Sequence, residues 1–274
     1  MQLTVKTPRI MAWRIEEEFA NTPHLHEDQF QITIPLYGKC FFTQENRTYD
    51  LSSGESLVQY PQDRHSFYLG ADSGVMILQV DRSGMDMLSA RGPAEPALRQ
   101  RIDPALALEG FRSWYGGLLA GERIDRLATE EIESKILFFL YRHLEGSHSS
   151  PGAQAPIWAE VASADRPLAR VLAYIREHYA EPLGVDELAA IAMQSRFHFI
   201  RSFKAHTGTS PYQYVLRIRV EAAKGLLLHT RMTVTEVALQ AGFASVSQFH
   251  RAFAKSAGMT PEQFRAAAGK ESGR

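Results

Sequence analysis

Three histidines and one glutamine in the first quarter of the chain could bind a metal ion or a small molecule. They are His24, His26, Gln31 and His65. Neutral imidazole is a good ligand for Zn, Fe, Ni or Cu, whereas the amide of Gln31 is a weak replacement for a carboxylate anion. The same imidazoles can form hydrogen bonds with a carboxylate or hydroxyl group of an organic ligand, or satisfy one another as structural residues. All three roles stay open. We favour contact with a ligand, and we expect no bound metal and no cofactor.

A second set of residues recurs at a fixed offset of fifty positions near the C-terminus. Seven of nineteen positions are identical between the segment Ser195 to Gln213 and the segment Ser245 to Gln263. A repeat of this size is one supersecondary module used twice. Each copy opens on a Ser, a good N-cap, and its helix closes at a Gly that is soon followed by Ser-Pro or Thr-Pro. The pattern predicts two helix-turn-helix modules.

The second helix of the first module, residues 195–206, is predicted to have two distinct faces. A spacing of 3, 4 and 7 residues gives a buried stripe of Phe199, Ser202, Phe203 and His206. The residues expected on the opposite, solvent-facing side are Phe197, Ile200, Arg201 and Lys204. An Arg on such a face can bind guanine O6 and N7, and apolar atoms can contact a thymine methyl group. The exposed face is typical of a helix that reads DNA. A helical bundle with solvated surface arginines is the alternative.

The segments Ser195 to Tyr214 and Gly242 to Arg265 resemble the AraC/XylS family of bacterial transcription regulators. The resemblance covers about residues 168 to 265. In that family, two helix-turn-helix units joined by a long helix insert into successive segments of the major groove. The resemblance therefore implies base contacts by Phe197, Ile200, Arg201, Val246, Ser247, His250 and Arg251. We also expect Arg196 and Lys204 to bind DNA. Ala254 departs from the pattern, because the family often has Lys at this position.

The first eighty residues are predicted to form short strands separated by turn signals. The clearest strands are Gln29–Leu36, Cys40–Thr43, Ser56–Tyr60, His65–Leu69 and Val75–Val80. Many short strands at this spacing favour an antiparallel sandwich or barrel.

Part of this region resembles the cupin barrel. The matching residues are His24, His26, Gly54, Pro61 and His65, with Gln31 where the family usually has Glu. Cupin-like sensor domains commonly precede AraC-type domains, so the resemblance implies an effector site formed by the three histidines and Gln31. We expect His24 and His26 to alternate along one strand and therefore to share a face.

The distribution of charge divides the chain into two halves. The net charge of the 274 residues is −1, but from Pro167 onward there are 14 Lys and Arg against 8 Asp and Glu, whereas before it there are 16 against 23. A basic C-terminal half suits DNA, and an acidic N-terminal half avoids phosphates. The segment Gly146 to Pro156 has the composition of a flexible linker. The single cysteine, Cys40, and the absence of any long apolar run predict a cytoplasmic protein that does not contact membranes.

These observations predict an α+β protein of two domains. Residues 1–146 form a cupin-like β-barrel with a helical hairpin, for effector sensing and dimerisation; residues 147–166 form a linker; and residues 167–274 form an all-α DNA-binding domain with two helix-turn-helix units. In the hairpin, an apolar stripe comprises Ile132, Ile136, Phe139, Leu140 and His143. Packing against the barrel and pairing in a homodimer explain this stripe equally well.

The favoured function is a sequence-specific, DNA-binding transcriptional regulator, an activator that responds to a small-molecule effector. Its expected partners are double-stranded DNA, the effector, a second copy of the chain and, for activation, RNA polymerase. A metal-cupin enzyme with a DNA-binding tail is disfavoured, because Gln31 breaks the usual set of two His and one carboxylate. We expect no catalytic residues. A constitutive regulator whose barrel only dimerises remains open.

Overall fold

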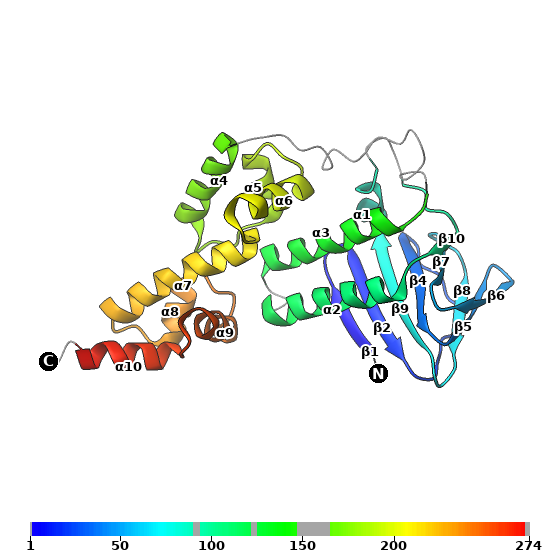
Figure 1. Cartoon of the computed structure of the whole chain (residues 1–274), viewed down its shortest axis with the longest axis horizontal. Helices are drawn as coiled ribbons and strands as arrows, with labels where there is room; N and C mark the ends of the chain where they lie inside the picture. Colours follow the sequence, from blue (N-terminus) through cyan, green and yellow to red (C-terminus); the bar gives the residue numbers. More distant parts are fainter. Residues whose placement is uncertain (1, 90–93, 122–124, 147–164, 272–274) are drawn as a thin grey trace. The chain divides into compact units, whose positions relative to one another are not determined.

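The computed structural model describes residues 2–89, 94–121, 125–146 and 165–271 (Figure 1). The chain forms two compact units. The first comprises Met1–Gly117 and Ile132–Glu160, and the second comprises Leu118–Glu131 and Val161–Arg274. The second unit therefore contains a segment that precedes the expected linker, which the sequence did not indicate.

The first unit is built on two antiparallel sheets. In sheet order, the six-stranded sheet contains β1 (Gln2–Lys6), β2 (Ile10–Glu16), β9 (Gly74–Asp81), β4 (Gln29–Tyr37), β7 (Glu55–Gln59) and β10 (Arg99–Arg101). The four-stranded sheet contains β3 (Phe19–Ala20), β8 (His65–Leu69), β5 (Lys39–Gln44) and β6 (Arg47–Ser52). The architecture is the expected β domain.

The two sheets share one apolar core. Along β5, Cys40, Phe42 and Gln44 are buried while the residues between them are exposed, which is the period of two expected for a strand with one covered face. Phe42 stacks on Phe67 of β8 with ring centroids 6.2 Å apart. The six-stranded sheet contributes Ile15, Leu57, Val75 and Ile77 to the same cluster.

Three helices come after β9: α1 (Arg82–Asp86), which precedes β10, and then α2 (Pro104–Gly121) and α3 (Arg126–His143). Trp114 of α2 meets Phe139 of α3 edge to face at 5.4 Å. Ile132, Ile136 and Leu140 are at most 3% exposed. These three residues of the stripe are therefore covered by packing, whereas Phe139 and His143 are half-buried.

The second unit contains α4 (Asp165–His178), α5 (Val185–Ile191), α6 (Arg196–Thr207), α7 (Pro211–His229), α8 (Val234–Gln240), α9 (Val246–Ala257) and α10 (Pro261–Glu271). The pairs α5–α6 and α8–α9 are the two predicted helix-turn-helix modules, and α7 connects them. Each module has its own core, one centred on Phe199 and Phe203 and the other on Phe249 and Phe253.

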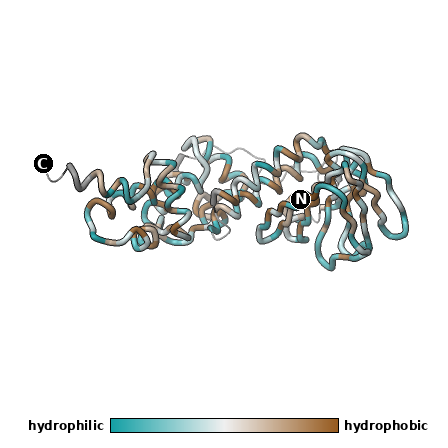
Figure 2. Tube along the Cα trace, turned by 90° about the horizontal axis from the view of Figure 1, so that it is seen from below, coloured by the Kyte–Doolittle hydropathy of each residue, from teal (hydrophilic) through white to brown (hydrophobic). Residues whose placement is uncertain are grey.

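No helix in the described ranges is long and apolar enough to cross a membrane. In Figure 2 hydrophobic and hydrophilic stretches alternate along the helices and the strands alike. This alternation is what elements with one covered and one solvated face require.

Candidate functional site

The helices α6 and α9 begin and end at the residues that the repeat predicts. The Oγ atoms of Ser195 and Ser245 accept hydrogen bonds from the backbone N–H groups of His198 and Gln248, at 3.5 and 3.1 Å. Gly208 and Gly258 close the helices with φ of 74° and 70°, in the left-handed region that favours glycine. The two copies therefore present helices of equal length, 12 residues each.

Seven of the nine side chains that were predicted to contact DNA are exposed or half-buried on α6 and α9. Arg201 and Lys204 on α6 are exposed, as are Ser247 and Arg251 on α9. The half-buried members of the set are Ile200, Val246 and His250. Arg201 and Arg251 occupy equivalent positions in the two copies, so each helix presents one guanidinium group at the same place.

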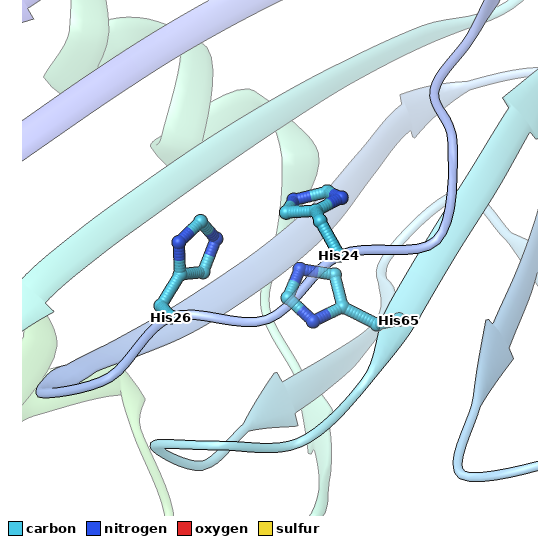
Figure 3. A group of neighbouring side chains, drawn as sticks. All are labelled: His24, His26 and His65. Atoms are coloured by element: carbon cyan, nitrogen blue, oxygen red, sulfur yellow. The ribbon is translucent and has the colours of Figure 1, made fainter.

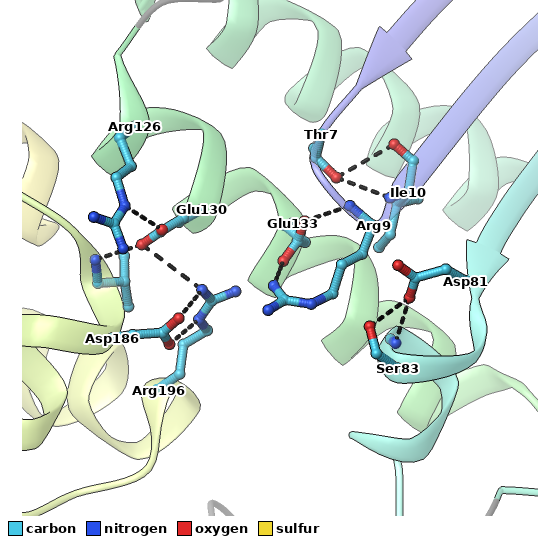
Figure 4. Close-up of polar contacts among 12 residues, drawn as sticks. Thr7, Arg9, Ile10, Asp81, Ser83, Arg126, Glu130, Glu133, Asp186 and Arg196 are labelled. Atoms are coloured by element: carbon cyan, nitrogen blue, oxygen red, sulfur yellow. Dashed lines mark hydrogen bonds and ion pairs between the residues drawn. The ribbon is translucent and has the colours of Figure 1, made fainter.

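Arg196 and Phe197 do not share this exposure, since each is only 5% exposed. The Arg196 Nε and Nη2 atoms donate to the two carboxylate oxygens of Asp186 at 2.7 and 2.6 Å. Its Nη2 also lies 3.7 Å from Oε2 of Glu130 (Figure 4). The expectation that Phe197 faces solvent is therefore wrong for this structure. The contacts of Arg196 place the first residue of α6 against Asp186 of α5 and Glu130 of α3.

His206 departs from the predicted faces in the other direction. It was expected on the buried stripe, but it is exposed. Phe199 and Phe203 anchor α6 in the core, and the last turn of the helix lies beyond them.

The three histidines of the first unit form a cluster in which the rings lie close to one another (Figure 3). Their ring centroids are 4.5 to 5.2 Å apart. His24 and His65 are paired by two backbone hydrogen bonds, of 3.0 and 2.8 Å. His24 lies in this isolated bridge and His26 lies outside any strand, so the expected alternation along one strand is wrong. The pairing with β8, rather than a strand of their own, brings the rings together.

Hydrogen bonds to backbone carbonyl groups fix the proton position on two of the rings. Nδ1 of His65 donates to the carbonyl oxygen of Asp63 at 2.9 Å, and Nδ1 of His24 donates to that of Thr22 at 2.9 Å. When Nδ1 of a neutral imidazole carries the proton, Nε2 has a free lone pair. Nε2 of His65 is buried and has no hydrogen-bond partner among the described residues.

Burial favours the neutral form of two of the rings, His65 and His26. Burial lowers the pKa of His65 to about 4, with the nearby rings of His24 and His26 acting in the same direction and the bond to the Asp63 carbonyl opposing them. Burial, followed by the neighbouring His24, also lowers the pKa of His26. Neutral rings accept hydrogen bonds or coordinate cations, and they attract carboxylate anions less than imidazolium would.

A row of buried polar side chains extends from the cluster across the six-stranded sheet. Gln31 of β4 lies directly opposite Gln59 of β7 and Gln79 of β9. Nε2 of Gln31 donates to Oε1 of Gln59 at 3.1 Å, and Nε2 of Gln79 donates to Oε1 of Gln31 at 3.0 Å. Nε2 of Gln79 also lies 2.8 Å from Nε2 of His26, which acts there as the acceptor and so cannot donate to Gln31.

Gln59 and Gln79 were missed by the sequence analysis. Gln79 is a single amide inside the apolar run of β9, Gln59 follows Leu57 and Val58 at the end of β7, and each is at most 9% exposed. A lone amide at such a position is the signal that could have found them, because buried polar groups need partners.

The histidine cluster can bind either of two kinds of ligand. One nitrogen from each of the three rings lies within 4.8 Å of the others, which suits a divalent transition metal. The lone pairs of the rings and the amides of the glutamines equally suit an organic molecule with hydroxyl groups. A separate cavity of about 460 Å³ is lined by Tyr49, Glu55, Arg99 and Arg101 among others, and none of the three histidines borders it.

Comparison with known proteins places these features in a family context. A family model described as a helix-turn-helix domain matches residues 188–267. The chain is 31% identical over 258 residues to the HTH-type transcriptional activator RhaS of Escherichia fergusonii, a match that covers 89% of this chain and 87% of that protein. It is 26% identical over 266 residues to the "Probable transcriptional regulator LumQ" of Photobacterium leiognathi, covering 96% and 98%.

The DNA-binding domain of AdpA, solved in complex with a target DNA, also matches. It is 40% identical to this chain, covers 37% of this chain and 91% of that chain, and has a TM-score of 0.36.

Proposed function

Since the chain belongs to the AraC family of DNA-binding transcriptional regulators, we propose that it activates transcription at specific promoters when a small molecule binds in its first unit. Double-stranded DNA is its partner. We propose further that it works in the cytoplasm as a homodimer, contacts RNA polymerase when it activates, and carries out no catalysis. The relative RhaS is itself named a transcriptional activator.

We assign the reading of DNA bases to α6 and α9. The equivalent, exposed guanidinium groups of Arg201 and Arg251 support this assignment, because a planar guanidinium can bind guanine O6 and N7 together. Ile200, Val246, Ser247 and His250 are placed to contact neighbouring base edges. Lys204 is exposed near the end of α6, and we assign it to a phosphate.

We assign the effector to the cluster of His24, His26, Gln31 and His65. The observation that carries this proposal is the buried Nε2 of His65, which has no partner among the described residues and faces two other rings. A buried acceptor without a partner costs about 1–3 kcal/mol, so a ligand hydroxyl that donates to it would bind favourably. Because the lowered pKa keeps His65 uncharged, we propose a hydroxyl-bearing molecule rather than a simple carboxylate.

His65→Phe is the sharpest test of the effector site. The His65 ring stacks on Phe42 at 5.8 Å, so phenylalanine preserves this packing and removes both ring nitrogens. Native mass spectrometry of the full chain, purified from cells, should show a bound small molecule that the variant lacks. A reporter assay should show that the variant no longer responds to that molecule, while Arg101→Gln, in the separate cavity, responds normally.

Two results would change the assignment. If His65→Phe responds like the parent chain, the cluster is structural and the effector binds elsewhere. If elemental analysis of the parent chain finds one equivalent of a transition metal that His65→Phe lacks, the three rings hold that metal. The metal would then supply positive charge to the site, which the neutral amide of Gln31 does not offset.

A further inference from the structure

The two copies of the module differ in exposure only over the first three residues of their reading helices. Arg196 and Phe197 of α6 are buried, whereas their counterparts on α9, Val246 and Ser247, are half-buried and exposed. One turn further on the copies agree again, because Arg201 and Arg251 are both exposed. The first two residues are therefore more covered in α6 than in α9. At the third residue the order is reversed, because His198 is half-buried and Gln248 is buried.

The segment Asp125–Glu131, at the start of α3, contacts the covered end. Glu130 is 6% exposed, and its Oε2 accepts a hydrogen bond from the Val185 backbone N–H at 2.6 Å. The same oxygen pairs with Arg196 at 3.7 Å (Figure 4). The N-cap residue of α5, Gly184, has no side chain that could accept this bond. Glu130 thus supplies the missing cap of one helix and a second anion for the first residue of the next.

Two further carboxylates hold the same segment in place. Oε1 of Glu131 accepts from the Tyr212 backbone N–H at the start of α7, at 2.6 Å. Oδ2 of Asp125 accepts from Nε2 of Gln248 on α9 at 3.0 Å and lies 3.4 Å from Nη1 of Arg219 on α7. The segment is therefore bonded to α5, α7 and α9 and lies 3.7 Å from Arg196 of α6. Its apolar residues Leu127 and Ala128 join the core of the first module.

We propose that Asp125–Glu131 is an anionic mask, which contacts the first residue of the first reading helix and must leave before Arg196 can reach DNA. The proposal rests on the assignment of α6 to DNA reading. A carboxylate and a phosphate bind a guanidinium in the same way, so a DNA phosphate can take the place of Glu130 on Arg196. The other partner of Arg196, Asp186, has a side chain that is 53% exposed, and it keeps its two hydrogen bonds to the guanidinium when the mask leaves.

The place of the mask in the chain suits a regulatory role. Ile132, the residue that follows the mask in α3, already belongs to the first unit, where the effector is proposed to bind. A ligand shifts such an equilibrium only if it favours one of the two states. An effector that binds the first unit more tightly when the mask has left α6 would raise the affinity for DNA. The continuous helix α3 would connect the two events.

Glu130→Gln in the full chain tests the mask. The glutamine Oε1 still accepts the Val185 N–H, so the fold is kept, but the charge that competes with phosphate is gone. Affinity for a duplex selected from a random pool should rise by about 5-fold or more, the lower range of coupling in allosteric proteins. The salt dependence should steepen by about one unit, because Arg196 gains a phosphate. Adding Arg196→Gln to Glu130→Gln should cancel the gain.

Glu133→Gln is the matched control. It removes the same charge from the same helix, but Glu133 bonds to Arg9 within the first unit at 2.6 Å. Its DNA affinity should equal that of the parent chain. An unchanged or lowered affinity for Glu130→Gln would overturn the mask, and so would an equal gain for both variants, which would report general loosening of α3.

Hydrogen exchange of the unmodified chain gives a second test that does not depend on any variant folding. On addition of the selected duplex, amides of residues 126–131 should exchange faster while those of α6 exchange more slowly. Slower or unchanged exchange in 126–131 would overturn the proposal. Failure of the base-reading assignment is separate, because it would appear as normal specific binding by Arg201→Ala.

Discussion

Replacement of Arg201 by alanine tests the assignment of α6 to base reading. Arg201 is exposed on a helix that Phe199 and Phe203 anchor in the core, so its removal leaves no cavity and should not change the melting temperature. If its guanidinium binds a guanine edge, loss of that contact costs about 1–3 kcal/mol at the specific site. This range corresponds to a dissociation constant that is larger by roughly 5- to 150-fold. Arg251→Ala should lose a similar amount, because it occupies the equivalent position on α9.

Fluorescence anisotropy with a selected duplex and a scrambled duplex of the same length measures the effect. Arg201→Ala should weaken binding to the selected duplex and change binding to the scrambled one much less. Lys204→Ala, one turn further along α6, is the comparison. It should weaken binding to both duplexes alike and reduce the salt dependence by about one unit, since it is assigned to a phosphate.

The reasoning is refuted if Arg201→Ala weakens binding to both duplexes equally. Arg201 would then hold the DNA backbone, and the face of α6 that reads bases would have been misidentified.

Phe203→Ala should lower the free energy of unfolding by about 3–5 kcal/mol, because the ring is fully buried; a loss below that range in urea unfolding would mean that the core closes around the gap. Lowering the pH from 7 toward 4 should destabilise the first unit. His65 takes up a proton near pH 6.5 when unfolded but only near pH 4 when folded, so the free energy of unfolding falls across this window, and His65→Phe should show a shallower fall. Burial raises the pKa of the Cys40 thiol to about 12, so iodoacetamide should label Cys40 only after unfolding, and rapid labelling in native buffer would contradict its burial.

The parts of the fold that the sequence predicted are those specified by local signals. Ser195, Gly208, Ser245 and Gly258 each act through neighbouring backbone groups, so the bounds of α6 and α9 could be predicted. The alternation along β5 likewise depends on residues two apart. A period of two or a capping residue needs no knowledge of distant elements.

The parts that could not be predicted depend on residues far apart in the sequence. A helical wheel describes an isolated helix, so it placed Phe197 on the open face and could not show that Glu130 contacts the neighbouring Arg196 from the start of α3. The row formed by Gln31, Gln59 and Gln79 depends on the register of three strands, which no single strand reveals. The sequence pattern also did not predict the strands β1 and β2, because Gln2–Lys6 and Ile10–Glu16 mix polar and apolar residues.

Footprinting of the full chain on its selected duplex tests the central claim most directly, that two repeated helices of one chain read successive segments of the major groove. Hydroxyl-radical cleavage should show two protected patches on one face of the duplex, about one helical turn or 10 base pairs apart for each bound chain. Arg201→Ala should weaken one patch and Arg251→Ala the other. A single patch, or equal loss of both patches in each variant, would contradict the account.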